Sequence, residues 1–139
     1  MARRRATYRI GLDVQSIEEV QDSIAEFGDL YTQRVFTPHE IESSAGDSST
    51  RASSLAGRFA AKEAVLKVLD IEDKVPAMRS IEIWRVDDRR PTVRLKGLAA
   101  ELARQQGIDQ FSLSLSHSGG VAAAAVIAQI SPRWFWTRR

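Results

Sequence analysis

The stretch GRFAAKEAVLK, residues 57–67, decides the fold, because strong helix-forming residues fill it. Side chains on a helix advance by about 100° per residue, and the large apolar residues of this region fall within one arc of about 80°. The pattern predicts a long helix from about residue 51 to residue 70, with a core face made of Leu55, Phe59, Leu66 and Leu69. Gly57 costs about 1 kcal/mol relative to alanine inside a helix, which indicates close approach of a backbone or a ligand.

Glu63 and Lys67 lie one helical turn apart beside this core face. At that spacing they can form an ion pair worth about 0.2–0.5 kcal/mol. Ala56 and Ala60 project in nearly the same direction, however, and their small side chains leave room beside the charges for something else. The second interpretation is therefore that Glu63 and Lys67 face a ligand.

A strand predicted over residues 7–14 carries Asp13 near its carboxyl end. A carboxylate in that position needs a cation, a helix cap or water. Asp13 therefore either caps the helix that follows or meets a cation. Two carboxylates, Asp13 and Glu63, on separate elements with a lysine nearby favour a hard ion such as Mg²⁺, held partly by substrate phosphates. The chemistry indicated is phosphoryl transfer.

The stretch SLSLSHSGG, residues 112–120, places His117 where a strand passes into a glycine-rich turn. A lone histidine there serves either as a surface hydrogen-bonding group or as part of a rim that contacts phosphate together with the serines and glycines around it. No spacing in the sequence specifies a Ser/His/Asp triad.

The other predicted elements indicate an α+β fold, in which an antiparallel sheet packs against one long helix and shorter helices. The first short helix has Ser16 and Glu19 at capping-box spacing and Gly28 as its stop, and the second begins with Thr37, Pro38 and Glu40. Residues 43–50 are expected to form a mobile loop. Strands are predicted over residues 80–86, 92–95, 111–116 and 121–127, with a helix over 97–107. Helices and strands in this order could form a half-barrel that assembles with copies of itself.

Length and composition indicate one domain over residues 1–139, with tails expected at 1–6 and 131–139. The chain has no cysteine and two histidines, so a zinc site is not expected. Its longest apolar run is far below the roughly 20 residues that a membrane span needs, and a cytoplasmic location fits best. The net charge of +2 includes arginine clusters at both ends, whereas the region from Asp13 to Asp47 holds nine carboxylates and one base, Arg34.

Three segments together resemble the holo-acyl-carrier-protein synthases, a group of small enzymes within the 4′-phosphopantetheinyl transferase superfamily. They are IGLDV, then LAGRFAAKEAVLKVL about fifty residues later, then SLSLSHSGGVAAAAVI near the end. The likeness covers roughly residues 9–129 and includes FTPHE and RPTVRLKG. The long-helix motif is very specific. The other two segments are unspecific alone but support the resemblance through their order and spacing.

The resemblance implies Mg²⁺-dependent transfer of 4′-phosphopantetheine from coenzyme A to a serine of an acyl carrier protein, releasing adenosine 3′,5′-bisphosphate. It implies Asp13 and Glu63 as metal ligands, Lys67 beside the phosphates, and His117, Arg58 and Lys62 as coenzyme-binding residues. The base that accepts the serine proton stays open between Glu63 and water. The family fold is an α+β half-barrel that forms a homotrimer with sites between subunits. The carrier can belong to fatty-acid or polyketide synthesis.

The chain departs from the family pattern in two places. No glycine follows Gly57 until Gly97, whereas the family commonly has glycine soon after the motif lysine. The first helix is acidic, where a basic face for an acidic carrier would be usual, which shifts the expected docking surface towards Arg51 and the amino-terminal arginines. Two alternatives remain: a non-catalytic coenzyme A-binding or scaffold relative, and a nucleic-acid-binding module resting on the terminal arginines and the aromatic residues 134–136.

Overall fold

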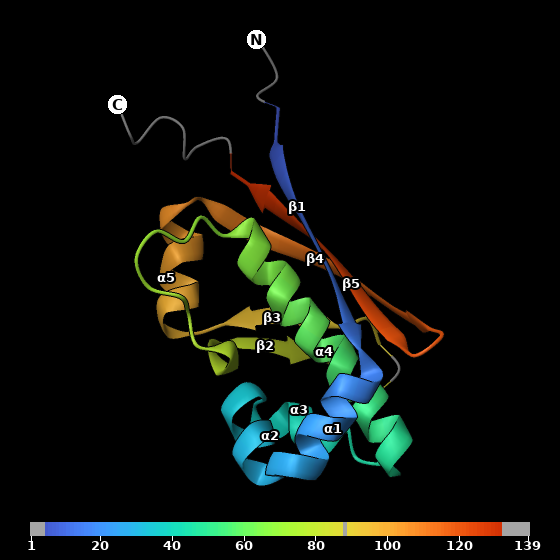
Figure 1. The fold of residues 1–139 in the computed structure, drawn as a ribbon. Coiled ribbons are helices and arrows are strands. Elements are labelled where there is room, and N and C mark those ends of the chain that lie inside the picture. The colour runs from blue at the N-terminus through green and yellow to red at the C-terminus, as the bar shows by residue number, and fades with distance from the viewer. Residues whose placement is uncertain (1–4, 88, 132–139) are drawn as a thin grey trace.

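The fold is built around helix α4 (Ser48–Val68), which crosses one face of an antiparallel sheet (Figure 1). The computed structural model describes residues 5–87 and 89–131. Within them the sheet has three strands in the order β1 (Thr7–Ser16), β5 (Val121–Ile130) and β4 (Ile108–Ser118). β5 is therefore the central strand, paired with β1 on one side and β4 on the other.

The remaining elements lie around the sides of α4 that do not face the sheet. A hairpin of β2 (Ile81–Trp84) and β3 (Thr92–Leu95) follows the short 3₁₀ helix η1 (Met78–Ser80), and α5 (Gly97–Gln105) leads from the hairpin into β4. Helices α1 (Ile17–Phe27), α2 (Asp29–Val35) and α3 (Pro38–Ser43) cluster at one end of α4 (Figure 1). The predicted α+β class with an antiparallel sheet and one long helix is confirmed.

Local capping signals predicted the starts of the short helices correctly. The Ser16 hydroxyl accepts a hydrogen bond from the Glu19 amide, and Gly28 ends α1 with a φ of 55°. Thr37 and Glu40 form the reciprocal capping box of α3, with Pro38 in its first turn. The sequence did not predict α2, which follows Gly28 directly.

The prediction of a mobile loop over residues 43–50 is wrong for the residues that belong to helices, Ser43 in α3 and Ser48 to Thr50 in α4. The Asp47 carboxylate accepts a hydrogen bond of 2.8 Å from the Thr50 amide, and α4 already begins at Ser48. Serine, threonine and aspartate serve helix starts as well as loops, since their side chains satisfy the free amides of the first turn. The composition of this segment therefore indicated a cap rather than a flexible connection.

Helix α4 is buried on more sides than its apolar arc predicted. Ala56 and Ala60 are fully buried, so they do not clear open space beside Glu63 and Lys67 as expected, whereas Phe59 and Leu66 are only partly buried. The reason is that the sheet, α1 and β2 all contact this helix. Small residues on a helix allow such neighbours to approach closely, which a pattern of large apolar residues cannot reveal.

Strand β1 approaches α4 at backbone distance through Gly11. A Cβ atom added to Gly11 would lie closer than 3.0 Å to the Ala64 carbonyl oxygen and would also meet the Val68 side chain. The glycine therefore permits a contact that a side chain would prevent. Asp13 is two residues further along the strand, so it is on the same face and is carried to the side of α4.

A buried ion pair ties α4 to the smaller helices. Lys62 and Glu40 are both fully buried, and the Nζ–Oε1 distance between them is 2.6 Å. The Lys62 ammonium also donates to the carbonyls of Val35 and Met78, while Glu40 accepts the Thr37 and Ile83 amides. Every charge of this pair is thus hydrogen-bonded, as burial requires.

Several expectations concern residues outside the described part. Residues 1–4, 88 and 132–139 are not described, and they include most of the terminal arginines and the aromatic stretch 134–136. Among the described residues, no helix combines the length and the apolarity needed to cross a membrane.

Replacing Gly11 with alanine should destabilise the protein, because the new methyl group would displace β1 from α4. We expect a loss of roughly 1–3 kcal/mol in the free energy of unfolding, the usual cost of overpacking. Gly57→Ala is the matched control: nothing lies within 4 Å of the added Cβ, and the change should stabilise the helix by about 0.5–1 kcal/mol. Urea unfolding of both variants measures this, and an unchanged Gly11→Ala stability would contradict the close contact.

Replacing Lys62 with methionine should cost about 3–5 kcal/mol, because it leaves the Glu40 carboxylate buried without its partner. Lys67→Met, at a lysine that is 53% exposed, should cost less than about 1 kcal/mol. Thermal unfolding compares the two. Equal losses would show that Lys62 has no special structural role.

Candidate active site

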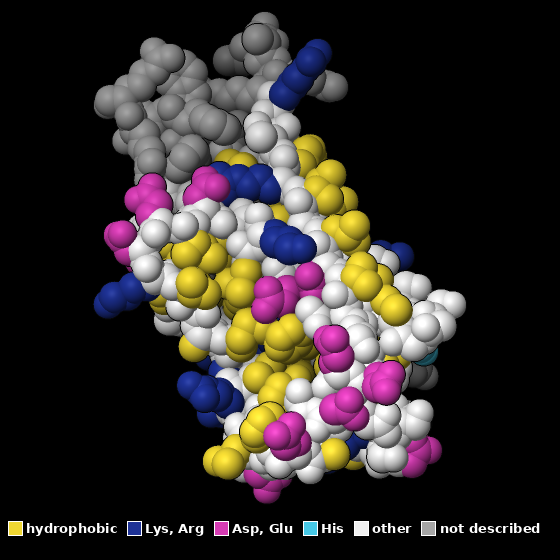
Figure 2. Space-filling model, viewed as in Figure 1, with side chains coloured by type: hydrophobic (Ala, Val, Ile, Leu, Met, Phe, Trp, Pro, Cys, Tyr) yellow, Lys and Arg dark blue, Asp and Glu magenta, His cyan; other side chains and the backbone are white. Residues whose placement is uncertain are grey.

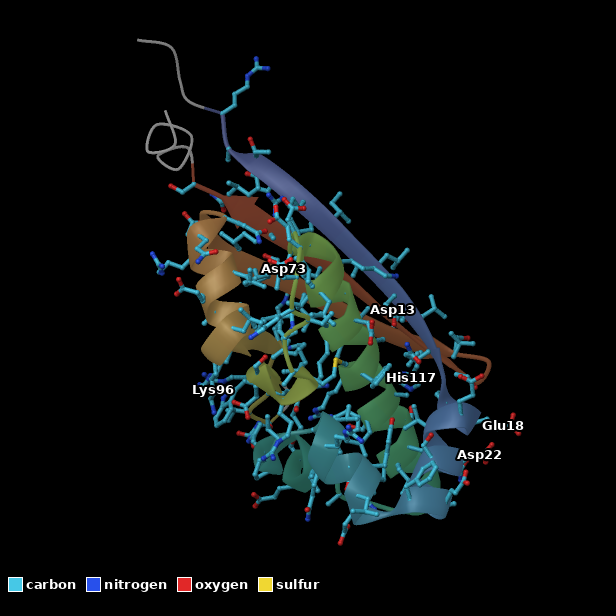
Figure 3. The ribbon with its side chains drawn as sticks, turned by 60° about the vertical axis from the view of Figure 1, so that its left-hand side comes forward. Asp13, Glu18, Asp22, Asp73, Lys96 and His117 are labelled. Carbon is cyan, nitrogen blue, oxygen red and sulfur yellow. The ribbon has the colours of Figure 1, made fainter. Side chains whose placement is uncertain are left out.

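Asp13, which Figure 3 labels on β1, forms the first part of the candidate site together with Lys67 of α4. The Lys67 ammonium lies 3.3 Å from Asp13 Oδ1 and donates to the Leu12 carbonyl at 2.7 Å. Gln15 donates to the other Asp13 oxygen at 2.8 Å. Asp13 is therefore not the cap of α1, a role that Ser16 fills, and the cation that it meets is Lys67.

Glu63 lies close to this pair but is not hydrogen-bonded or ion-paired to either partner in the described chain. Burial raises the pKa of the Glu63 carboxyl, and the negative charge of Asp13 raises it further, while Lys67 lowers it. The simple Glu63–Lys67 ion pair is not formed, because Lys67 reaches across to β1. Two carboxylates that repel each other are thus held beside a single ammonium.

This donor set fits a hard divalent cation. It offers carboxylate oxygens from two rigid elements, which is the chemistry that Mg²⁺ prefers. No group of three or more His, Cys, Asp or Glu side chains among residues 5–87 and 89–131 could enclose a metal. A cation bound to Asp13 and Glu63 would need further oxygens from a substrate or from water, which suits a diphosphate-containing ligand.

A cavity of about 210 Å³ forms the second part of the candidate site. Gly57 and Arg58 of α4 line it together with His117 from the end of β4 and with Arg85 and Pro91 from the β2–β3 connection. A Cβ on Gly57 would meet nothing within 4 Å, so the glycine borders open space rather than a closely packed backbone. The ligand that the sequence also indicated for this position stays a prediction.

Arg58 gives this cavity its chemistry. Its guanidinium donates to the Ser54 hydroxyl and to the Ser43 hydroxyl, at 2.8 Å for the latter, but its buried Nε has no hydrogen-bond partner. Burial lowers the pKa of Arg58, the Glu40 carboxylate opposes this, and the nearby Arg85 lowers it further. A buried guanidinium with an unused donor and a second arginine close by fits an anionic ligand.

The two parts lie on opposite flanks of α4 within one chain. In the sheet, Asp13 pairs with Ala124 from one side and Leu115 pairs with the same residue from the other, so the central strand separates them. His117 and Arg58 are on the β4 side, whereas Glu63 and Lys67 contact the β1 side. The structure therefore brings Asp13, Glu63 and Lys67 together and brings Arg58 and His117 together, but it does not join the two sets.

Lys62 belongs to neither set. Its ammonium is fully buried and engaged by Glu40 and two carbonyls. Burial lowers the pKa of Lys62, and the Glu40 charge opposes that shift. The structure thus places Lys62 away from both sets, because neighbouring residues on a helix such as Lys62 and Glu63 point in different directions. The coenzyme contact expected of Lys62 stays a prediction.

The sequence missed two residues that line or support the site. Gln15 could have been found, because it is two residues after Asp13 on the same strand face. Arg85 could not, since its position beside Arg58 depends on how the β2–β3 hairpin packs against α4.

Comparisons with known proteins identify the family of the chain. A sequence profile of the 4′-phosphopantetheinyl transferase superfamily matches residues 9–128. A holo-acyl-carrier-protein synthase of Halothermothrix orenii is 34% identical over 120 residues, covering 86% of this chain and 95% of the relative. Among solved structures, the ACPS–CoA complex of Chronobacterium ammoniagenes superposes with a TM-score of 0.76 at 28% identity, covering 90% and 98% of the two chains. The Helicobacter pylori synthase in complex with coenzyme A gives 0.70 at 29% identity, covering 86% and 99%.

The match of the family model to residues 9–128 defines the class of the protein, the 4′-phosphopantetheinyl transferase superfamily. The identity and coverage of the relatives give the finer assignment. The chain belongs to the holo-acyl-carrier-protein synthase family of that superfamily.

Glu63→Gln should stabilise the protein at pH 8 when coenzyme and metal are absent. A raised pKa means that the folded state binds the Glu63 proton more tightly than the unfolded state does. The protonated Glu63 carboxyl therefore stabilises the wild-type protein below the ordinary glutamate pKa, and this contribution is lost as the pH rises through the folded-state value. The difference in Tm between variant and wild type should narrow as the pH falls towards about 4.

Glu101→Gln is the control with the opposite sign. Hydrogen bonds from Arg104 and Gln105 lower the pKa of Glu101, so its contribution is present above the ordinary pKa and is lost as the pH falls. This substitution should not stabilise the protein at pH 8. A Tm gain for Glu101→Gln but none for Glu63→Gln would contradict the electrostatics described for the site.

Proposed function

We propose that the protein transfers 4′-phosphopantetheine from coenzyme A to a serine hydroxyl of an acyl carrier protein. The observation that carries the proposal is the placement of Asp13 and Glu63 beside Lys67 in a chain of this family. The serine oxygen would form a bond to the phosphorus that bears pantetheine, and the bond from that phosphorus to the bridging oxygen would break. Adenosine 3′,5′-bisphosphate leaves, and the serine proton passes to Glu63 or to water.

Each side chain has a role in this proposal. Asp13 and Glu63 would hold Mg²⁺, which when bound supplies positive charge against the coenzyme diphosphate. Lys67 provides a second positive charge at the same place and, through its bond to the Leu12 carbonyl, keeps β1 aligned with α4. Arg58 and His117 would receive the anionic adenosine bisphosphate part of the coenzyme in the neighbouring cavity.

The separation of the two sets supports an assembly with sites between subunits. No element among residues 5–87 and 89–131 covers the β1 side chains on the sheet face turned away from α4. Tyr8, Ile10, Leu12 and Val14 on β1 are each more than half exposed. Figure 2 shows apolar side chains following this edge of the molecule. Such a surface is typical of a protein interface. We infer a homotrimer in which Asp13, Glu63 and Lys67 of one subunit face Arg58 and His117 of the next.

Asp13→Ala and Glu63→Ala should each reduce transfer at least a hundredfold while leaving the protein folded, because each removes a proposed metal ligand rather than core volume. Mass spectrometry of a carrier protein incubated with coenzyme A and Mg²⁺ detects the phosphopantetheine mass gain. Full activity of either variant at saturating Mg²⁺ would exclude the assigned role, and no mass gain with wild-type protein would exclude the function.

Mixed assemblies test the placement of sites between subunits. Asp13→Ala and His117→Ala chains, co-expressed in equal amounts, should recover activity, because about one quarter of the sites in a random cyclic trimer would receive both intact halves. Asp13→Ala mixed with Glu63→Ala is the control and should recover none, since both changes affect the same half. Equal recovery in both mixtures, or a monomer by sedimentation, would contradict the proposal.

A further inference from the structure

A hollow of about 410 Å³ lies between helix α5 and the connection that follows α4, outside the proposed site. Glu72 and Asp73 line it from the connection, on which Figure 3 labels Asp73, and Leu98 and Leu102 line it from α5. Leu98 is 37% exposed, so part of this apolar lining meets water. The hollow therefore offers apolar surface next to carboxylates, and the proposed transfer uses none of these residues.

The hollow keeps a net negative charge. Asp70 also lines it, and the Arg9 guanidinium lies 3.2 Å from the Asp70 carboxylate. Glu72 and Asp73 are exposed, and neither forms an ion pair in the part of the chain that the structure describes. Lys74 brings one positive charge to the lining against these two carboxylates. A complementary occupant is therefore cationic and apolar at once.

The connection that carries these carboxylates is held in place. Gln106, at the end of α5, accepts a hydrogen bond from the Asp70 amide and donates one to the Asp70 carbonyl, at 2.8 Å each. Arg9 of β1 donates to the same Gln106 oxygen at 2.6 Å and to the Val68 carbonyl at 3.0 Å. Because these bonds tie the connection to α4, α5 and β1, the hollow is formed before anything binds in it, which lowers the free-energy cost of docking.

The chain leaves the sheet at the rim of this hollow. The Ser131 amide, just past β5, donates to the Gly107 carbonyl at 2.8 Å, and Gly107 follows the lining residue Gln106. Eight further residues, 132–139, follow in the sequence, beyond the family match that ends at residue 128. An extended segment of that length spans roughly 26 Å, whereas α5 is about 14 Å long, so the segment can reach along the hollow.

We propose that residues 132–139 dock in this hollow of their own chain. The aromatic side chains at 134–136 lie against the two leucines of α5, and the arginines lie beside Glu72 and Asp73. The segment has three aromatic residues, three arginines and no acidic side chain, so it matches both the apolar surface and the charge of the hollow.

The inference goes beyond the proposed function and does not depend on it. The connection that lines the hollow begins just after α4, at the end of the helix that carries Lys67. A docked segment would therefore hold this connection against α5 and limit movement at that end of α4.

The test uses the fluorescence of the segment itself. The chain has three tryptophans, so Trp84→Phe leaves only Trp134 and Trp136. In the full chain at low salt, acrylamide should quench these two residues weakly. Glu72→Lys/Asp73→Lys should raise the Stern–Volmer quenching constant about twofold, because a docked indole loses much of its accessible surface. High salt should raise it too, since screening weakens exposed charge pairs.

Two further variants show whether the effect is specific to the hollow. Glu18→Lys/Asp22→Lys makes the same charge change at exposed positions on α1 and should leave the quenching constant unchanged. Arg138→Glu/Arg139→Glu, added to the reversed hollow, pairs opposite charges again and should restore the protection. Rescue of this kind would not follow if the two carboxylates of the hollow only supported the fold.

A mixed assembly decides whether the segment docks on its own chain. Chains with the reversed hollow and both segment tryptophans are co-expressed with chains that keep the intact hollow but carry Trp134→Phe/Trp136→Phe, all in the Trp84→Phe background. The tryptophans should stay as open to acrylamide as in the reversed variant alone. Recovered protection would place the segment on a neighbouring copy and overturn docking within one chain.

Two other results would overturn the inference. If the tryptophans quench as readily as N-acetyltryptophanamide while the hollow is intact, the segment does not dock. If reversal of the hollow leaves them protected and Ile10→Ser on the exposed face of β1 does not, the segment lies against β1 instead.

Discussion

The close contact between Gly11 and the Ala64 carbonyl is the constraint on which the site depends. It lets β1 lie against α4 at backbone distance, and strand geometry then places Asp13, two residues further on, beside Glu63 and Lys67. Three charged side chains from two elements far apart in the sequence therefore meet without a flexible loop between them. Sites held on rigid elements keep their geometry more accurately than sites on loops, which suits chemistry that depends on aligning two phosphate oxygens and an attacking hydroxyl.

Helix α4 has contacts or proposed site residues on all of its sides. One side packs on the sheet, a second side holds Lys62 in the buried pair with Glu40, and the two flanks between them carry the two halves of the proposed site. The alanines of this helix are small because neighbours press against it, rather than because a ligand fills the space above them. A helix used in this way keeps the two halves of the proposed site apart within one chain. The separation of Asp13 from His117 and the uncovered apolar face of β1 are thus two consequences of one architecture.

Charge is divided between regions of the molecule. Carboxylates gather on α1, and arginines gather on the hairpin and in the cavity next to it. The net charge of the chain conceals this division, because the terminal arginines offset the acidic region from Asp13 to Asp47. A partner meets the local electrostatic field of each surface, and that field differs in sign between α1 and the hairpin. The acidic region also speaks against a nucleic-acid-binding function.

The sequence by itself determined the class of fold, the caps of α1 and α3, the long helix and the residues Asp13, Glu63 and Lys67, because these follow from local periodicity, capping chemistry and a specific motif. Only the tertiary structure decided which charges meet. Lys67 pairs with Asp13 rather than with Glu63, Lys62 is buried against Glu40, and Arg85 reaches Arg58, all through contacts between residues distant in the chain. A helical pattern gives the direction of a side chain around its own axis, but the element that lies in that direction depends on how the whole chain packs.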